Sequence, residues 1–255
     1  MQKIIIIGIG AGDPDYMTVQ AINALNKVDV FFIPNKGAEK AALQRLRVEI
    51  CERFIENRTY RFVEVEMPER AKEFSDYRSN VTDWHAQIEE SYVKFLTNEL
   101  GEGECGAILV WGDPALYDST LRIVESIRSK GYALEYDVIP GISAIQVLTA
   151  KHRIPLNRIG GAVVLTPARR LAEGFPDDLD TIVVVLDGEQ TFKRLDGEVF
   201  DIYWGAYLGT ADEILLAGKL SEVRSEIETV RARARKEKGW IMDTYLLRRR
   251  QEATG

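Results

Sequence analysis

The opening of the chain, MQKIIIIGIGAGDPDYMT, constrains its fold more than any other segment. An apolar run from Ile4 to Ile7 leads directly into glycines at every second position, Gly8, Gly10 and Gly12. A buried strand that ends in a glycine turn lets the backbone approach a ligand closely. We therefore expect a strand, a glycine-rich turn and a helix, with a ligand site at the carboxyl end of the strand.

The spacing of this turn is unfavourable for a dinucleotide. The dinucleotide fingerprint G-x-G-x-x-G would place its third glycine where the chain has Asp13. The fingerprint also requires an acidic residue at the end of the second strand, to bind a ribose hydroxyl. The second apolar run, at 28–33, carries its acidic residue, Asp29, near its beginning. An NAD-dependent oxidoreductase is therefore the weaker alternative.

Strand-like runs alternate with helical patterns, which predicts a largely parallel sheet with helices on both faces. In the first half, the expected strands are 4–8, 28–33, 61–65, 107–111 and 134–139, and the expected helices are 18–27, 38–51, 82–100, 119–130 and 141–151. After a proline-bearing connector at 154–157, the expected strands are 162–166, 181–186, 202–207 and 241–247, and the expected helices are 190–196 and 220–238. We predict two α/β domains, 1–156 and 157–255, and a cleft between two such units is a common ligand site.

Composition and charge argue against several classes of protein. The apolar runs are far shorter than the ~20 residues of a membrane-spanning helix, and we expect no signal peptide. With only Cys51 and Cys105, we expect no disulfide framework, no metal cluster and a cytoplasmic protein with reduced thiols. A net charge of −7 and a pI of about 5.1 argue against a nucleic-acid partner. The arginines at 248–250 are interpreted as a solvated tail.

Two further turns follow expected strands. The segment WGDPALYDST places a Gly-Asp-Pro step at 112–114, which repeats the step at 12–14. The segment VIPGISA turns the chain at Pro140 and opens a helix with Ser143 and Ala144. Backbone N–H groups at a helix start can hold an acceptor, and small side chains leave room for a flat ligand. Taken singly, each turn could also be an ordinary tight turn or a helix N-cap.

Taken together, in this order and spacing, the three turns resemble the tetrapyrrole methylase superfamily. The pattern is GxGxGDxxxxT, then GDPxxY, then PGIS before a helix and IPL, and the likeness spans nearly the whole chain. The resemblance implies two α/β domains of the tetrapyrrole methylase type, with the active-site cleft between them. It also implies S-adenosyl-L-methionine (SAM) as methyl donor, with S-adenosyl-L-homocysteine (SAH) as product, a small-molecule tetrapyrrole substrate and a homodimer.

Three features narrow the resemblance within the family. Ala11 replaces the proline that is common in the first turn, and the segments 76–88 and 241–247 depart from the general pattern. They resemble the branch of aerobic cobalamin biosynthesis that methylates carbon 1 of precorrin-5 and releases acetate to give precorrin-6A. The alternatives are a member acting at another precorrin position or on a non-tetrapyrrole substrate such as ribosomal RNA or an elongation factor, and a ligand-binding regulatory protein.

The resemblance also implies which residues contact the cofactor. Leu186 stands where the family usually has a methionine, and it would give apolar contact without the polarisable sulfur. Gly209 matches the glycine of a turn near the adenine. The implied cofactor contacts are, in chain order, Trp111, Gly112, Asp113, Leu116, Ser143, Ala144, Leu186 and Gly209.

The first turn would face the tetrapyrrole, which assigns Gly10 and Ala11 to the substrate. The substrate carries many carboxylates, and arginine suits bidentate contact with a carboxylate. Arg169 and Arg170, at the end of an expected strand, and Arg78 are therefore candidate substrate ligands. The alternative for all three is a solvated loop arginine.

Methyl transfer chiefly requires alignment of the reacting atoms and exclusion of water. Loss of the acyl group requires more, because a base is expected to activate the attacking water. The candidate bases are His85, which lies in the distinctive segment, Asp13 and the less favoured His152. A surface or capping role is the alternative for each histidine.

Overall fold

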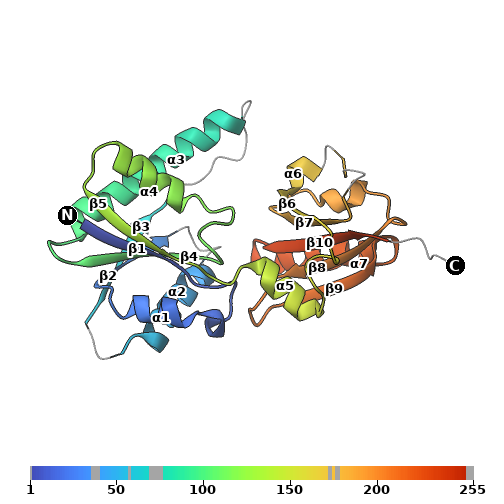
Figure 1. The fold of residues 1–255 in the computed structure, drawn as a ribbon, viewed down its shortest axis with the longest axis horizontal. Helices are drawn as coiled ribbons and strands as arrows, with labels where there is room; N and C mark the ends of the chain where they lie inside the picture. The colour runs from blue at the N-terminus through green and yellow to red at the C-terminus, as the bar shows by residue number, and fades with distance from the viewer. Residues whose placement is uncertain are drawn as a thin grey trace. The chain divides into compact units, whose positions relative to one another are not determined.

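The computed structural model describes residues 2–35, 41–56, 59–68, 77–171, 174–175 and 179–250, except for the side chains at 41–42 and 77–83. The chain divides into two compact units, Met1–Ser143 and Ala144–Gly255, and each contains its own five-stranded sheet (Figure 1). This division assigns helix α5, Ala144–His152, to the second unit. The predicted domain boundary after residue 156 follows that helix and stays a prediction.

The sheet of the first unit has the order β3-β2-β4-β1-β5, and every pairing in it is parallel. This confirms the largely parallel sheet that the alternating pattern predicted. The central strands are buried on both faces, so their sequences are almost continuously apolar. The strands are β1 (Gln2–Gly8), β2 (Val30–Asn35), β3 (Arg61–Glu66), β4 (Cys105–Val110) and β5 (Leu134–Ile139).

Helices cover both faces of this sheet, as expected (Figure 1). Because side chains alternate along a strand, β1 contributes Ile5 and Ile7 to one core and Ile4 and Ile6 to the other. The helices α1 (Val19–Leu25) and α2 (Ala41–Phe54) pack on the first core. The second core contacts α3 (Tyr77–Lys94), its π-helical continuation η3 (Phe95–Glu99) and α4 (Thr120–Ser129).

The second unit has a mixed sheet with the order β6-β7-β10-β8-β9. Only β6 and β7 are parallel, and the other pairings are antiparallel. Along β8, Trp204 packs in the core together with Ile227 of α7, whereas the ring of Tyr203 meets His152 of α5. The elements are β6 (Val163–Pro167), α6 (Ala168–Leu171), β7 (Thr181–Val185), η4 (Thr191–Arg194), β8 (Phe200–Ala206), β9 (Ile214–Lys219), α7 (Leu220–Lys238) and β10 (Asp243–Arg249).

Three expectations about local structure are wrong. Strand β9 was not expected, the helix expected at 190–196 is the single 3-10 turn η4, and the arginines at 248–250 are not a solvated tail. Arg248 is only 9% exposed and donates to the carbonyls of Pro155 and Leu156 at 2.7 and 3.2 Å. Arg248 and Arg249 belong to β10, a strand of the second sheet. Arg248 is held there because carbonyl groups shielded from water require hydrogen-bond donors.

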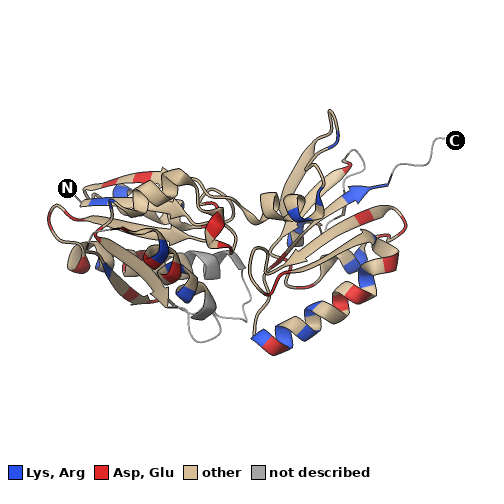
Figure 2. Cartoon of the chain, turned by 90° about the horizontal axis from the view of Figure 1, so that it is seen from below, with Lys and Arg blue, Asp and Glu red and all other residues tan. Residues whose placement is uncertain are grey.

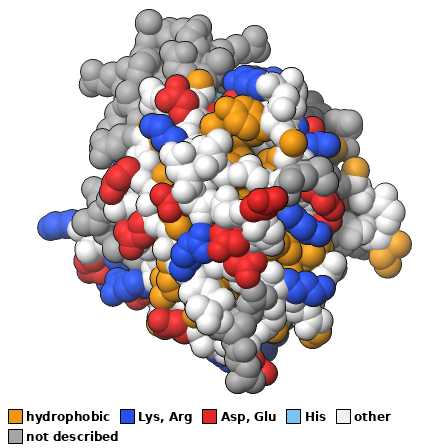
Figure 3. Space-filling view, turned by 90° about the vertical axis from the view of Figure 1, so that its left-hand side faces the viewer, with side chains coloured by type: hydrophobic (Ala, Val, Ile, Leu, Met, Phe, Trp, Pro, Cys, Tyr) orange, Lys and Arg blue, Asp and Glu red, His pale blue; other side chains and the backbone are white. Residues whose placement is uncertain are grey.

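Charged side chains of both signs are interspersed over the surface. Helix α7 carries Lys, Arg and Glu along its length (Figure 2). The face of the molecule seen in Figure 3 has acidic and basic groups side by side. Lys3, for example, pairs with Glu135 and Asp137 at 3.8 and 3.4 Å. Within the described ranges, every helix is too short or too polar to cross a bilayer.

Candidate cofactor and substrate site

The parallel register brings the three predicted turns to one edge of the first sheet. Gly8 at the end of β1 lies opposite Val110 at the end of β4, and Ile7 lies opposite Ile139 at the end of β5. The strands therefore end side by side, and the turns that follow them share the carboxyl edge. Ligands in open α/β sheets bind at this edge.

Hydrogen bonds join the three turns to one another. Gly10 and Gly112 form an isolated bridge. The N–H of Gly10 donates to the carbonyl of Gly112 at 3.3 Å, and the N–H of Gly112 donates to the carbonyl of Gly10 at 2.8 Å. The Oδ2 atom of Asp113 accepts from the backbone N–H of Gly141 at 2.9 Å. Its Oδ1 atom accepts from the N–H of Ala115 at 2.8 Å, which closes the middle turn. Asp113 thus organises the site, and its predicted contact with the cofactor stays a prediction.

Close backbone approach explains why glycines stand at the strand ends. A Cβ atom on Gly141 would lie 2.0 Å from the carbonyl oxygen of Gly112, and one on Gly8 would lie 2.6 Å from the nitrogen of Gly141. Gly10 and Gly112 have φ angles of +78° and +70°, in the left-handed region that favours glycine. The sequence suggested that these glycines let a ligand approach the backbone. The structure shows that they also let the backbones of the three turns pack closely against one another.

Trp111 presents the most informative polar group of this edge. Its indole nitrogen is buried and has no hydrogen-bond partner within the described part of the chain. A buried donor left without an acceptor costs about 1–3 kcal/mol, so a ligand acceptor would relieve a real penalty. Ser143 is also buried, at 5% exposure, while Leu116 and Ala144 are half-buried.

The first turn contains two predicted site residues with local roles. Ala11 is buried, at 2% exposure. Asp13 is the N-cap of the 3-10 turn η1, Pro14–Tyr16, and its Oδ1 atom accepts from the N–H of Asp15 at 2.9 Å. Capping occupies one carboxylate oxygen and leaves the other for chemistry, so the assignment of Asp13 as a base stays a prediction.

The candidate bases and the arginines are placed on different elements. His85 lies half-buried in α3 beside Trp84, with ring centroids 5.5 Å apart, and Trp84 donates from its indole nitrogen to the carbonyl of Pro68 at 3.0 Å. Arg78 lies in the same helix, and its side chain is outside the described residues. Arg169 and Arg170 are exposed in α6.

His152 lies in the second unit, at the end of α5. Its Nε2 atom is 3.0 Å from the carbonyl oxygen of Trp204. Burial lowers the pKa of His152, and this hydrogen bond opposes the shift. This bond and the contact with the ring of Tyr203 show that His152 packs within the second unit.

Two predicted cofactor residues lie in the second unit. Leu186 follows β7 with a φ of +56° and is 65% exposed, which is unusual for a large apolar side chain. The N–H of Gly209 is held by Glu213 Oε2 at 2.8 Å, and Glu213 also pairs with Lys151 at 3.0 Å. Sequence reasoning missed Glu213, although an acidic residue four positions after a turn glycine is a signal that could have revealed it.

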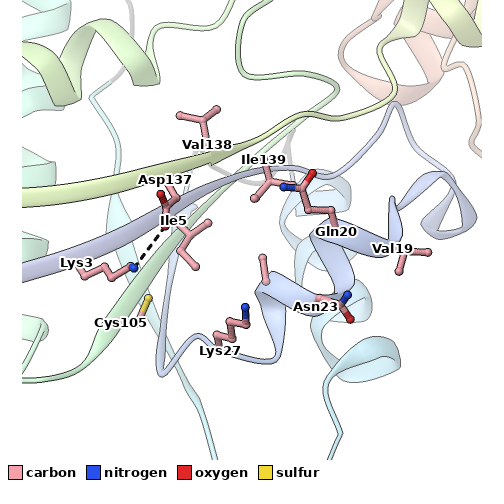
Figure 4. Close-up of a pocket in the computed structure, with 11 residues that line it drawn as sticks. Lys3, Ile5, Val19, Gln20, Asn23, Lys27, Cys105, Asp137, Val138 and Ile139 are labelled. Carbon is pink, nitrogen blue, oxygen red and sulfur yellow. Dashed lines mark ion pairs between the residues drawn. The ribbon is translucent and has the colours of Figure 1, made fainter.

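A separate cavity of about 860 Å³ lies along α1, β1 and β5 of the first unit (Figure 4). Its lining includes Lys3 and Cys105 near the amino ends of their strands, and Asp137, which pairs with Lys3 (Figure 4). None of the predicted site residues lines it. The described side chains also bring together no group of three His, Cys, Asp or Glu that could hold a metal ion.

Comparison with known proteins decides the family. The model of the family described as Tetrapyrrole (Corrin/Porphyrin) Methylases matches residues 3–224. The chain belongs to the tetrapyrrole methylase family. Its three glycine turns are therefore the turns of a tetrapyrrole methylase, as their order and spacing suggested.

Individual tetrapyrrole methylases agree with this assignment. A precorrin-6A synthase [deacetylating] of Sinorhizobium sp is 55% identical over 250 residues, which cover 98% of this chain and 96% of the relative. A Corynebacterium diphtheriae structure described as a cobalamin synthesis related protein (CobF) has 36% identity and a TM-score of 0.82, covering 97% and 98% of the two chains. The uroporphyrin-III-C-methyltransferase of Thermus thermophilus, at 16% identity and TM-score 0.59 over 97% and 94%, shares the two-domain fold.

Proposed function

We propose that this chain is a SAM-dependent C-methyltransferase of cobalamin biosynthesis that methylates carbon 1 of precorrin-5 and releases acetate, giving precorrin-6A. The observation that carries the proposal is the 55% identity, over 98% of the chain, to a precorrin-6A synthase [deacetylating]. Identity at this level over nearly the full length of both proteins extends far beyond the glycine turns that the family shares.

The carboxyl edge of the first sheet fits a cofactor of this kind. The buried indole N–H of Trp111 lacks an acceptor in the described part of the chain. A ligand atom bound beside the middle turn could accept this hydrogen bond. Gly112 has a φ of +70°, a conformation that favours glycine, and a glycine leaves the backbone there uncovered by a side chain. When bound, SAM supplies an electrophilic methyl group to an electron-rich ring carbon.

The chain itself contributes positioning more than covalent chemistry to the methylation. The hydrogen bonds from Gly10 to Gly112 and from Gly141 to Asp113 fix the three turns before any ligand arrives. Preorganised geometry of this sort reduces the entropy lost when two reactants are aligned. The predicted substrate contacts of Gly10, Ala11, Arg78, Arg169 and Arg170 belong to this proposal.

Deacetylation requires a water molecule to attack the acyl carbonyl. The carbon–carbon bond to the ring then breaks, its electron pair passes to the conjugated ring, which takes up a proton, and acetate leaves. A side chain that removes a proton from this water would accelerate the step. We assign that role to His85, which is half-buried in α3, with Asp13 as the other candidate. The homodimer and the cytoplasmic location expected from sequence belong to the proposal as well.

The test is turnover by the purified full chain with precorrin-5 and SAM carrying an isotopically labelled methyl group. We expect labelled precorrin-6A, SAH and acetate in equal amounts. The matched variant is Trp111→Phe, which removes the indole N–H and keeps an aromatic ring, and it should weaken SAH binding by about threefold to tenfold. Methylation of a different precorrin, or no turnover with tight SAH binding, would overturn the assigned reaction while leaving the family intact.

A further inference from the structure

Strands β2 and β4 separate before they reach the carboxyl edge of the first sheet. Their pairing covers only Val30–Phe32 against Gly106–Ile108, whereas β2 continues alongside β3 as far as Asn35. Beyond Ile108, the side of β4 that faces β2 therefore lacks a strand partner. The turn that begins with Trp111 starts just past this opening.

The side chain of Arg47, from α2, fills this separation. Its Nε atom donates to the carbonyl of Leu109 at 3.0 Å, and one terminal nitrogen donates to the carbonyl of Leu43 at 2.8 Å. The residue is only 8% exposed. A guanidinium has five N–H donors, so these two bonds leave part of its planar fork unused.

Arg47 is a buried cation with no carboxylate in an ion pair with it among the described residues. Burial lowers the pKa of Arg47, and electrostatic interaction with Tyr92 and Asp118 opposes this shift. One oxygen of the Asp118 carboxylate accepts from the N–H of Thr120 at 2.7 Å, at the start of α4. A buried charge that lacks an ion-pair partner is costly, and a neutral side chain could have satisfied the two carbonyl groups.

We propose that Arg47 binds a carboxylate of the tetrapyrrole substrate at the opening between β2 and β4, beside the middle glycine turn. This inference rests on the proposed function, which supplies a substrate with many carboxylates. The guanidinium fork matches a carboxylate in a bidentate way that lysine cannot reproduce. The bonds to Leu109 and Leu43 fix the fork before the substrate arrives, so little side-chain entropy remains to be lost on binding.

The test compares Arg47→Met, Arg47→Lys and the control Arg45→Met, which makes the same change at an exposed position of the same helix. The measurements are KM and kcat for precorrin-5, the Kd of uroporphyrin by fluorescence titration, and the Kd of SAH. Arg47→Met should raise the KM for precorrin-5 and the Kd of uroporphyrin by about 10- to 100-fold, as for a lost hydrogen-bonded charge. For Arg47→Lys, the KM and the Kd of uroporphyrin should lie between those of wild type and Arg47→Met. For Arg45→Met, both values should match wild type.

The SAH titration separates the two possible sources of the carboxylate. If Arg47→Met leaves the tetrapyrrole affinity unchanged, or weakens only SAH, the proposal is overturned, because the carboxylate would then be absent or would come from the cofactor. Should Arg47→Met not fold, Arg47→Lys decides, since it retains the charge and one donor. If wild type binds neither SAH nor a tetrapyrrole, it is the proposed function that fails.

Discussion

The carboxylate of Asp113 is tied to the backbone of Gly141, whose N–H donates to its Oδ2 atom at 2.9 Å. This bond joins the turn after β4 to the turn after β5. The two strands are not neighbours, because β1 lies between them. A single side chain thus spans the central strand and fixes the geometry of the carboxyl edge.

Asp113→Ala should therefore loosen the site as well as the fold. It leaves the N–H groups of Gly141 and Ala115 without their acceptor, and each such loss costs about 1–3 kcal/mol when the donor is shielded from water. We expect a lower free energy of unfolding in urea and weaker SAH binding by calorimetry. Asp113→Asn retains one acceptor oxygen, so its free energy of unfolding and its SAH affinity should lie between those of wild type and Asp113→Ala. Unchanged SAH affinity in the alanine variant would show that the bond does not shape the site.

Gly141→Ala should be far more disruptive than an ordinary glycine substitution. The new Cβ atom would lie 2.0 Å from the carbonyl oxygen of Gly112, and backbone cannot yield as a flexible side chain does. We expect a loss of at least about 4 kcal/mol in the free energy of unfolding, which is exceptional for one residue. The control is Gly188→Ala, where a Cβ meets nothing within 4 Å. Similar stabilities for the two variants would contradict the close packing of the turns.

The ion pair of Arg231 and Asp243 should be a stability determinant of the second unit. Both side chains are 5% exposed, and Arg231 Nε lies 2.9 Å from Asp243 Oδ2, which also accepts from Trp204 at 3.0 Å. Arg231→Met should lower the free energy of unfolding by about 3–5 kcal/mol, because it strands a buried carboxylate. The double variant with Asp243→Leu should recover part of the loss, and equal loss in both would argue against the pairing.

Glu104 should give a pH-dependent contribution to stability. Arg61 and the backbone N–H of Gly101 hydrogen-bond its carboxylate and lower its pKa from 4.5 to about 2. A carboxylate whose pKa is lowered in the folded state stabilises the fold above the unfolded value, and this contribution is lost as the pH falls from 4.5 through about 2. NMR titration of Glu104 checks the value, and in Arg61→Gln the midpoint should return toward 4.5. A midpoint unaffected by that substitution would contradict the cause.

The sequence predicted the first sheet well because its signals are local. Apolar runs that end in glycine define the strands, and parallel register then forces their carboxyl ends together. Arg47 shows where such reasoning ends. An arginine in an amphipathic helix usually points to solvent, and only its spacing from the buried Ile50 and Cys51 indicated that it faces the core.

Strand β9 was missed for a related reason. Its run, ILLAGK, is followed directly by the first residue of α7, so no loop separates the strand from the helix. Its identity as a strand comes from antiparallel pairing with β8, which periodicity over six residues cannot reveal. Register and long-range contact, rather than local preference, decided this element and the burial of Arg248 in β10.

His85 provides the prediction that separates the two halves of the proposed reaction. Methylation chiefly needs alignment, whereas acetate release needs an activated water. His85→Ala should therefore retain SAH binding and methyl transfer but release acetate at least about 100-fold more slowly, so a methylated intermediate that still carries the acyl group should accumulate. Mass spectrometry of the quenched reaction detects that species, and enzymatic assay measures the acetate.

The matched control for this prediction is His152→Ala, which removes the other histidine of the chain. Its ring packs on Tyr203 and approaches the carbonyl of Trp204 within the second unit, so it should affect stability and leave the ratio of acetate to methylated product unchanged. Normal acetate release by His85→Ala would exclude His85 as the base and transfer the role to Asp13. Loss of methylation and acetate together would instead show that His85 binds the substrate, because a base for the second step alone cannot slow the first.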